Sequence, residues 1–416
     1  MASSNPRIAI IGGGPAGLVL GLLLHKHDIA FTIFELRQKP TDEELARPSG
    51  MLDLHEESGL AALRECGLYN HFLNHTGECS EAQKVADKDG NIIYEDEGEL
   101  SQRPEISRHA LTSLLASNLP ANSIKYEHKL LSVSTNNNNN NNTPETELDF
   151  GPHGKHAFDL VIGADGAWSR VRGALTDTNP HYTGMQSITA TIPNLTAKYP
   201  HLSSLIGQGS FSALGFRHGV MSQRGSSDSA RIYIFLSLAD ENFPSTSGLD
   251  FETGKHRLLT DKSLLGSFGE PIKDLVSVAC DEEFASTESE SLPIKPLYTL
   301  PPKTSFPHSP NALITVIGDA AHLMPPWAGE GVNLAMWDSL LLSRAIIKAF
   351  QQSQSQDRAS FRTNLDPLLR DFEAEMFARA GEKAEETEGN GRMLFGEDGA
   401  RAFKEFFDSF YGAGND

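Results

Sequence analysis

The sequence predicts an α/β fold with two sheets, one parallel and flanked by helices, the other mostly antiparallel, followed by a C-terminal helix. Three observations predict it. A β-branched run at residues 8–11 ends in a glycine-rich turn and an apolar helical run. Apolar runs recur at residues 157–162 and 312–317, as in strands buried on both faces. Alternating apolar and polar residues dominate residues 183–299, as in half-buried antiparallel strands.

The first 35 residues carry a nucleotide-binding pattern. After the first strand, Gly12, Gly14 and Gly17 form GxGxxG, a helical run follows, and a second strand at residues 30–34 ends at Glu35. Gly12 permits a tight turn, Gly14 lets the backbone approach a pyrophosphate, and Gly17 lets helix and strand pack closely. The helix N-terminus attracts the diphosphate, and Glu35 can accept hydrogen bonds from ribose hydroxyls. This order predicts a Rossmann-like dinucleotide-binding domain, because a merely structural glycine turn would leave the acid unexplained.

Composition and charge exclude several classes of protein. The 416 residues include 55 acidic and 35 basic ones, so the formal charge of −20 argues against binding to nucleic acid or anionic lipid. Cys66, Cys79 and Cys280 are isolated, without metal-ligand spacing, and suit a reducing compartment. No apolar stretch reaches the ~18 residues of a membrane span, and no signal peptide is visible. We therefore expect a cytoplasmic monomer without metal, nucleic acid or membrane, whose partner is a small-molecule substrate.

The other elements follow from local patterns. Helical spacing predicts helices at residues 56–66 and 109–119, the second capped by Ser107, and residues 84–94 indicate a hairpin. The asparagine tract at residues 136–142 cannot bury a core, so we expect it at a mobile hairpin tip without a function. The remaining elements are expected as strands at residues 187–192, 211–216 and 231–238, helices at residues 254–268, 272–279, 332–350 and 367–388, and a polar linker at residues 351–358.

These elements divide the chain into three parts. The nucleotide-binding domain is expected to be discontinuous, built from residues 1–75, 101–182 and 300–366. Residues 76–100 and 183–299 are expected to form a second, substrate-binding domain around the antiparallel sheet. Residues 367–416 are expected to form a C-terminal helical segment that packs across both.

Two further motifs accompany the glycine-rich turn. Residues 159–166 read DLVIGADG, residues 317–322 read IGDAAH, and residues 325–333 add two prolines and GEGVN. In order and spacing, the three stretches resemble the class A FAD-dependent aromatic monooxygenases, the para-hydroxybenzoate hydroxylase superfamily. The sequences of residues 50–55 and 104–108, together with HLMPP at residues 322–326, are most similar to those of tetracycline-inactivating flavin monooxygenases.

The resemblance implies roles for individual residues. Glu35 would bind the adenosine ribose, Arg108 the ribityl-diphosphate region, and Asp319 the ribityl hydroxyls or diphosphate. As structural alternatives, Asp53 could cap a helix and Arg108 could form a surface ion pair. His322 is expected to orient its loop rather than move protons. The full set of expected FAD or NADPH contacts is Gly12, Gly14, Pro15, Ala16, Gly17, Glu35, Arg37, Arg47, Asp53, Arg108, Asp165, Asp319, Pro326, Gly329, Gly331, Val332 and Asn333.

Within this set, Arg47 matches an arginine of the relatives that contacts NADPH, and Asp165 a strand-end residue that serves flavin and nicotinamide. Gly331, Val332 and Asn333 would open a helix at the flavin ring. One departure concerns Arg37, since Leu36 separates it from the ribose-binding acid, whereas the relatives have the two side by side.

The resemblance also implies a reaction. FAD would be reduced by NADPH, and oxygen would form a flavin C4a-hydroperoxide that hydroxylates an electron-rich ring or enol. No amino-acid acid or base is nominated, because the flavin supplies the chemistry. Only one GxGxxG is present, so NADPH is expected to bind transiently. The alternatives are a flavin reductase or dehydrogenase without oxygen transfer, and a flavin-binding protein without turnover.

The expected substrate is a polycyclic aromatic or enol compound, with tetracyclines the first to try. The second sheet offers aromatic residues at strand spacing, and some of them must face a cavity beside the flavin loop. The expected substrate contacts are Thr189, Phe216, Tyr233, Pro325 and Trp327.

Overall fold

The first layer of the protein is a parallel sheet of five strands. The computed structural model describes residues 5–76, 82–98, 105–136, 144–243, 250–287, 291–309, 313–353 and 357–411. The strand order is β17-β11-β1-β2-β7, with every pairing parallel. The strands are β17 (Leu313–Val316), β11 (Leu160–Gly163), β1 (Ile8–Ile11), β2 (Thr32–Phe34) and β7 (Ile124–Lys125). The predicted parallel sheet is therefore confirmed.

Helices pack on this sheet and form one large apolar core with it. The core contains α1 (Pro15–Lys26), α5 (Arg108–Ser117), α12 (Gly331–Gln352) and the first half of α13 (Arg358–Leu394). The short helices α3 (Gly59–Glu65) and α4 (Tyr69–Leu73) also contribute to this core, whereas α2 (Asp42–Ala46) buries no residue. Ser107 accepts a hydrogen bond from the N–H of Ala110 at 3.1 Å, so the expected cap of α5 is confirmed.

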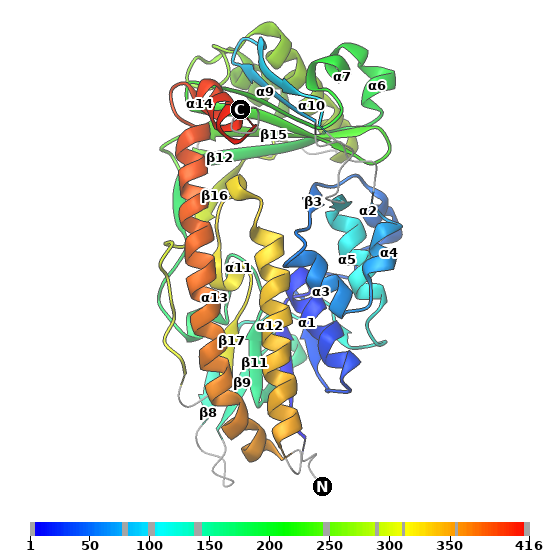
Figure 1. Ribbon diagram of the computed structural model, residues 1–416, viewed down its shortest axis with the longest axis vertical. Helices are drawn as coiled ribbons and strands as arrows, with labels where there is room; N and C mark the ends of the chain where they lie inside the picture. The colour runs from blue at the N-terminus through cyan, green and yellow to red at the C-terminus, as the bar shows by residue number, and fades with distance from the viewer. Residues whose placement is uncertain are drawn as a thin grey trace.

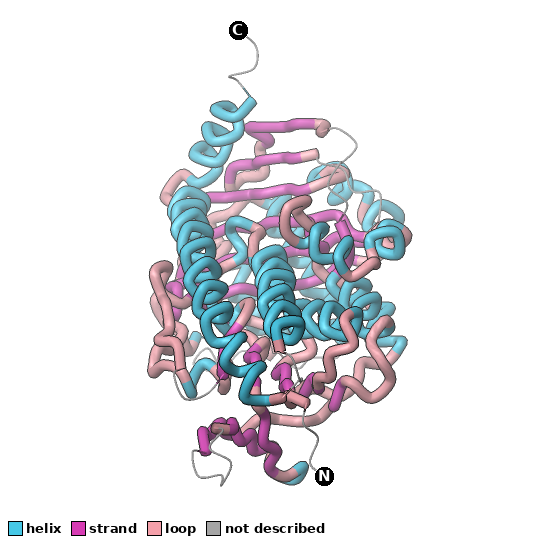
Figure 2. Tube along the Cα trace, turned by 60° about the horizontal axis from the view of Figure 1, so that its bottom comes forward, coloured by secondary structure: helices cyan, strands magenta, loops and turns pink. Residues whose placement is uncertain are grey.

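The second layer is a seven-stranded sheet in the order β16-β12-β15-β14-β13-β4-β5. All its pairings are antiparallel except that between β13 and β4. Figure 1 shows this sheet lying across one end of the molecule, and Figure 2 shows its strands crossing the body of the protein. Its strands are β4 (Gln83–Asp87), β5 (Ile92–Asp96), β12 (His181–Ile192), β13 (Ser210–Gly215), β14 (His218–Gly225), β15 (Ser229–Ser237) and β16 (Lys295–Thr299).

The two faces of this sheet have different partners. Alternate residues such as Ile188, Ile232 and Ile234 belong to a core shared with the outer helices. These helices are α6 (Leu195–Lys198), α7 (Pro200–Ile206), α9 (Phe251–Thr260) and α10 (Glu270–Thr287). The residues between them, such as Tyr233 and Phe235, belong to a third cluster with the loop before α12 and the end of α13. This period of two decides which side chains face the nucleotide-binding half.

Two small sheets complete the fold. β3 (Met51–Asp53) pairs with β6 (Glu105–Ser107), and Glu105 of β6 accepts a hydrogen bond from Gln223 of β14 at 3.1 Å. β8 (Ser132–Asn136), β9 (Glu145–Asp149) and β10 (Lys155–Phe158) form an antiparallel sheet. Asn136 pairs with Glu145 at the open end of the β8–β9 hairpin. The rest of the asparagine tract lies outside the described residues.

The C-terminal helices differ from the expected ones. α13 already begins at Arg358 and runs for 37 residues through Pro367, so the helix start predicted at Pro367 is wrong. Asp357 caps it by accepting from the N–H groups of Ala359 and Ser360. A further helix, α14 (Gly399–Tyr411), packs on β4, β5 and β13. In Figure 1, α13 runs the length of the molecule from the nucleotide-binding half to the second sheet.

Two strand predictions also need correction. β14 was not predicted, although it pairs along its whole length with β13 and β15. Residues 211–216 were expected to be one strand, but β13 ends at Gly215. Phe216 and Arg217 form the hairpin turn, with φ of 50° and 65°. This two-residue turn lacks the Asn-Gly or Asp-Gly pair that marks such turns in a sequence.

Within the described residues, every helix is too short or too polar to cross a bilayer. No group of three His, Cys, Asp or Glu side chains among those residues could hold a metal ion. Cys280 is buried and Cys66 is partly buried, and burial raises the pKa of each thiol to about 12. Cys79 lies outside the described residues.

Candidate cofactor and substrate site

The glycine-rich turn between β1 and α1 is shaped by close backbone contacts. Gly12 has φ of +112°, and a Cβ built on it would lie 2.1 Å from the carbonyl oxygen of Ala164. A Cβ on Gly17 would lie 2.0 Å from the carbonyl oxygen of Gly12. Both positions therefore exclude any larger residue. Around Gly14, by contrast, no heavy atom of the described residues lies within 4 Å of such a Cβ, so the turn is open at the N-terminus of α1.

Glu35 is held at the end of β2 by two backbone donors. The N–H of Gly13 donates to one carboxylate oxygen at 2.7 Å, and the N–H of Arg37 donates to the other at 2.8 Å. The acid therefore ties the glycine-rich turn to the second strand and stays beside the open face of Gly14. The side chains of Leu36 and Arg37 are exposed.

A second helix N-terminus converges on the first. A Cβ on Gly318, which follows β17, would lie 3.1 Å from Cβ of Ala335 and 3.5 Å from Cβ of Ala16. The Ser339 hydroxyl donates to the carbonyl oxygen of Ala16 at 2.8 Å. The starts of α1 and α12 therefore lie side by side, and both helices offer unpaired N–H groups and a positive dipole end to an anion.

The Asn333 side chain has a role that the sequence did not suggest. Its amide donates to the carbonyl oxygen of Asp53 at 2.9 Å and accepts from the N–H of His55 at 2.8 Å. Asn333 is fully buried, and the Ser58 hydroxyl also donates to it. The side chain thus clamps α12 to the loop after β3.

Asp319 lies in a hollow between the two helix starts. Burial among protein atoms raises the pKa of its carboxyl group, and the positive charges of His322 and Arg108 oppose that rise. The side chain is nevertheless exposed to solvent. A carboxylate that is surrounded by protein and still accessible lines a recess. The structure thus brings Asp319 and Arg108 near each other, and their contact with the ribityl-diphosphate part of a flavin stays a prediction.

Behind Asp319 lies a buried ionic network that sequence reasoning missed. His322 Nε2 is 2.6 Å from Asp338 Oδ2, and the N–H of Gly318 donates to the same oxygen at 3.0 Å. Arg379 of α13 donates to Asp338 Oδ1 at 2.9 Å. Burial lowers the pKa of His322, but the charge of Asp338 outweighs this effect and raises it overall. The network supports the expectation that His322 orients its loop.

A second charged group lies at the start of α12. His55 faces two carboxylates, Asp53 at 3.7 Å from Nε2 and Glu330 at 3.5 Å from Nδ1. Glu330 also pairs with Lys383 of α13 at 2.6 Å. Asp53 and then Glu330 raise the pKa of His55 to about 9, so the imidazole is a cation at neutral pH. The clue in the sequence was the histidine in GMLDLH, but nothing there placed it against a residue 275 positions away.

Other expected cofactor residues have protein partners. Asp165 accepts from the Ser169 hydroxyl at 2.5 Å and from the N–H of Arg170 at 2.7 Å, which fixes the turn after β11. Arg47 ends α2 and pairs with Glu43 at 3.3 Å, with its side chain half exposed. Cβ atoms on Gly329 and Gly331 would meet no described atom within 4 Å, and Pro326 beside them is exposed. The loop before α12 is therefore open at its glycines.

The inner face of the second sheet is aromatic next to this loop. Tyr233 pairs with Thr189 across β12 and β15, and its ring stacks 6.3 Å from that of Phe235. The Phe235 ring meets the ring of Trp327 edge to face at 4.7 Å, and the Trp327 ring meets that of Phe395 at 4.7 Å. We call Tyr233, Phe235, Trp327 and Phe395 the aromatic cluster.

The expected substrate residues are only partly brought together. Tyr233 and Thr189 lie on the inner face of the sheet, and Trp327 of the loop before α12 packs against that face through Phe235. Pro325, in the same loop, is buried. Phe216 is not on that face but at the tip of the β13–β14 hairpin. There Lys88 Nζ is 5.5 Å from the centre of its ring. Its strand-face placement is therefore wrong.

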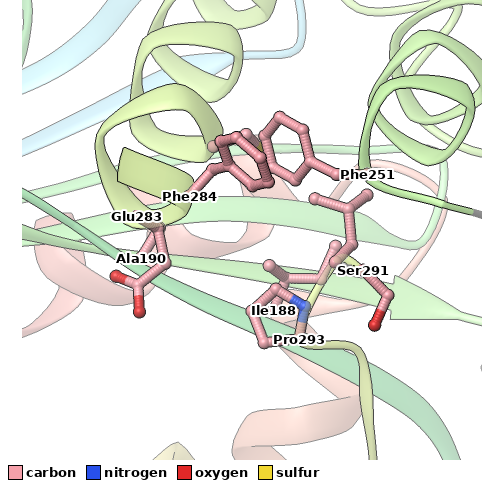
Figure 3. Close-up of a pocket in the computed structure, with 9 residues that line it drawn as sticks. Ile188, Ala190, Phe251, Glu283, Phe284, Ser291 and Pro293 are labelled. Carbon is pink, nitrogen blue, oxygen red and sulfur yellow. The ribbon is translucent and has the colours of Figure 1, made fainter. Parts of the chain in front are cut away.

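A small apolar crevice lies on the opposite face of the same sheet, under α9 and α10. Figure 3 shows the stacked rings of Phe251 and Phe284 above Ile188 and Pro293, with the Glu283 carboxylate at one side. The ring centres of the two phenylalanines are 4.2 Å apart. Because Ile188 belongs to the outer core, the whole sheet separates this crevice from the aromatic cluster.

The recess between the two helix starts fits FAD. Open space at Gly14, Gly329 and Gly331 leaves room for a ligand, the two helix N-termini favour its anionic groups, and Glu35 and Asp319 offer acceptors to its hydroxyls. When bound, the flavin would supply electron transfer and oxygen chemistry that no side chain can provide.

Comparison with known proteins agrees with this fit. A family model described as FAD binding domain matches residues 6–253 and 312–362. Monooxygenase penA of Penicillium thymicola is 35% identical over 438 residues, covering 98% of this chain and 99% of that protein. Monooxygenase asqM of Emericella nidulans is 31% identical over 441 residues, covering 97% and 98%. The chain therefore belongs to the FAD-binding monooxygenases and is an oxidoreductase, which confirms the resemblance to class A flavin enzymes.

Solved structures support the same fold. HpxO of Klebsiella pneumoniae, complexed with FAD and uric acid, superposes with a TM-score of 0.71 at 15% identity, covering 97% of this chain and 92% of that one. Tetracycline destructase Tet(55) superposes with a TM-score of 0.67 at 17% identity, covering 99% and 96%. At these identities the likeness concerns the fold.

Proposed function

We propose that this FAD-dependent monooxygenase uses NADPH and O₂ to hydroxylate a planar polycyclic phenol or enol. The observation that carries the proposal is the aromatic cluster on the inner face of the second sheet. It lies against the glycine-rich loop that precedes α12. An aromatic surface beside a flavin site suits a flat, apolar ligand, since ring faces and edges supply contact area without charge.

The residues of this chain would bind and orient rather than react. Trp327 packs on Phe235 and Phe395, so it forms a fixed wall between the loop and the sheet. Burial raises the pKa of the Tyr233 hydroxyl, so it remains a neutral donor for a substrate oxygen. The cluster would also exclude water from the oxygen-transfer step.

NADPH would bind only transiently. The chain has one GxGxxG, which belongs to the FAD site. Arg47, on the exposed rim beside α5, would contact the incoming nucleotide. The two alternatives predict other outcomes. A reductase would oxidise NADPH without inserting oxygen into a product, and a flavin-binding protein would not turn over.

The test is a panel of tetracyclines, anthraquinones and simple phenols, incubated with the FAD-loaded enzyme, NADPH and O₂. The proposal expects NADPH use that rises with a polycyclic compound and a product heavier by one oxygen atom. Tetracyclines come first because of the motif resemblance and the shared fold with Tet(55). Hydroxylation of hydroxybenzoates alone would refute the polycyclic substrate, and NADPH use without oxygenated product would favour the reductase.

Variants of the sheet give a matched comparison. Tyr233→Phe should raise KM for the best panel substrate about 2- to 10-fold, the value of one lost hydrogen bond, with FAD content unchanged. The control is Phe284→Leu, which alters an aromatic residue of α10, the helix that covers the opposite face of this sheet. Equal effects of the two variants would remove Tyr233 from the substrate site.

A further inference from the structure

The inference concerns the charged groups at the N-terminus of α12 and rests on the proposed function. Glu330 immediately precedes the helix, and its side chain is 10% exposed. A carboxylate at this position stabilises the helix dipole. It also puts a negative charge at the helix end that faces the open glycines of the cofactor loop. That charge would oppose any anion bound there.

Two cations flank Glu330 and come from different parts of the chain. His55, in the loop after β3, lies 3.5 Å from one carboxylate oxygen, and Lys383, on α13, lies 2.6 Å from the other. Asp53 faces His55 from its other side at 3.7 Å, and Glu386 faces Lys383 at 3.0 Å. With His55 protonated, His55 and Lys383 offset the charges of Glu330 and Asp53, and Glu386 adds one negative charge on the far side of Lys383.

The backbone keeps His55 in this place. Asn333 in the first turn of α12 accepts from the N–H of His55, and its amide also holds the carbonyl oxygen of Asp53. Asn333 thus holds the loop that carries His55 against the first turn of α12, and this keeps the imidazole close to Glu330. A surface ion pair has no such support and contributes little.

We propose that His55 and Lys383 are positioning residues that neutralise Glu330, so that the start of α12 presents positive potential to the bound flavin and makes its reduction easier. Oxidised flavin that takes up two electrons and one proton gains one negative charge. Removing a cation from this group would oppose that charge, and removing Glu330 would favour it.

The test is a spectroelectrochemical titration of the FAD-loaded protein at pH 7. Lys383→Met and His55→Gln should each lower the ratio of reduced to oxidised flavin at a fixed potential about tenfold, or about 30 mV for a two-electron couple. Glu330→Gln should raise that ratio, and the double variant His55→Gln/Glu330→Gln should return towards the wild type. The control is Lys303→Met, which removes a cation that lies in the loop after β16 and pairs on the surface with Glu385 of α13.

A second readout separates this electrostatic effect from a merely structural role. The pKa of His55 is about 9, so the potentials of wild type and His55→Gln should differ at pH 7 and converge above pH 9. Lower FAD affinity or melting temperature with an unchanged potential would overturn the inference, as would shifts of equal sign for Lys383→Met and Glu330→Gln. Lys383 is partly exposed, so its variant should fold even if His55→Gln does not. Failure of the wild-type protein to bind FAD would refute the proposed function instead.

Discussion

Asp319 is the side chain that we expect to contribute most to FAD binding, because it is surrounded by protein and still accessible to a ligand. Its carboxylate would accept from flavin hydroxyls, and a hydrogen bond to a charged acceptor is worth about 1.5–3 kcal/mol. We therefore expect Asp319→Ala to weaken FAD binding roughly 10- to 100-fold, measured by flavin fluorescence on reconstitution of the apoprotein. Asp274→Ala, which removes a carboxylate of the exposed His201 pair, is the control. Full flavin retention in Asp319→Ala would exclude Asp319 from the site.

His55 predicts a pH dependence of stability. Its pKa in the folded protein is about 9, raised from 6.5 by Asp53 and Glu330. A raised pKa stabilises the fold fully below pH 6.5, and the contribution falls to zero as the pH rises through 9. His55→Gln should therefore lower the free energy of unfolding by roughly 1–3 kcal/mol at pH 6 and by almost nothing at pH 9.5.

Denaturant melts of wild type and His55→Gln at the two pH values measure this difference. His201→Gln is the matched control, because His201 also pairs with a carboxylate, Asp274 at 2.8 Å, but is largely exposed. A pH-independent loss of stability in His55→Gln would mean that packing, not charge, makes the contribution.

At the scale of single residues, the sequence predicted which residues lie in the same region better than it predicted their hydrogen-bond partners. Asp319 and Arg108 were assigned to one region, and the structure brings them together. Asn333 was assigned to the flavin, but its amide is occupied by Asp53 and His55, which lie about 280 positions earlier. A motif gives the position of a polar residue in the sequence. It does not show which backbone group, distant in sequence, will be its hydrogen-bond partner in the folded protein.

At the scale of elements, prediction succeeded where the pattern is local. The unit β1–α1–β2 followed from its glycines and apolar runs, because strand, turn and helix are neighbours in sequence. β14 was missed, since His-Gly-Val-Met-Ser-Gln-Arg-Gly has few β-formers and is held by strands on both sides. α13 begins before Pro367 because Phe361 and Leu365 are fully buried, and this packing outweighs the helix break that proline favours.

The β8–β9 hairpin carries a prediction at this scale. The asparagine tract begins at Asn136, where the strand pairing ends. Replacing residues 136–142 by a short Gly-containing turn should leave activity and melting temperature nearly unchanged, because loop length has a weak entropic cost. Differential scanning fluorimetry checks this, with a wild-type sample in the same run as control. A fall of ~5 °C or more would mean that the tract packs against the protein.

At the scale of the molecule, there are two large apolar cores, and the second sheet separates the outer core from the candidate site. One core surrounds the parallel sheet and the other lies under the outer helices of the second sheet. The aromatic cluster connects the second sheet to the loop before α12 and to α13. Sequence periodicity predicted both sheets, but it could not tell that Phe211 faces the outer helices while Phe235 faces the loop. The domain boundaries stay a prediction.

In the part of the chain that the structure describes, the only glycine-rich turn between a parallel strand and a helix is that of β1 and α1, which gives a prediction for NADPH. Titration calorimetry of the FAD-loaded enzyme without substrate should show binding weaker than ~10 μM, or roughly −7 kcal/mol. Nanomolar binding would instead indicate a built nicotinamide site and favour the dehydrogenase alternative.

Arg47 tests where NADPH approaches. In stopped-flow measurements, Arg47→Ala should slow flavin reduction at subsaturating NADPH about 5- to 20-fold with FAD content intact, because a charge-assisted contact to phosphate is lost. Arg392→Ala is the matched control: both arginines pair with a glutamate four positions earlier, Glu43 at 3.3 Å and Glu388 at 3.6 Å. Arg392 lies on α13, whereas Arg47 lies at the end of α2. Slow flavin reduction in Arg47→Ala alone would therefore indicate that NADPH approaches along the rim formed by α2 and α5. Equal rates in both variants would remove Arg47 from that path.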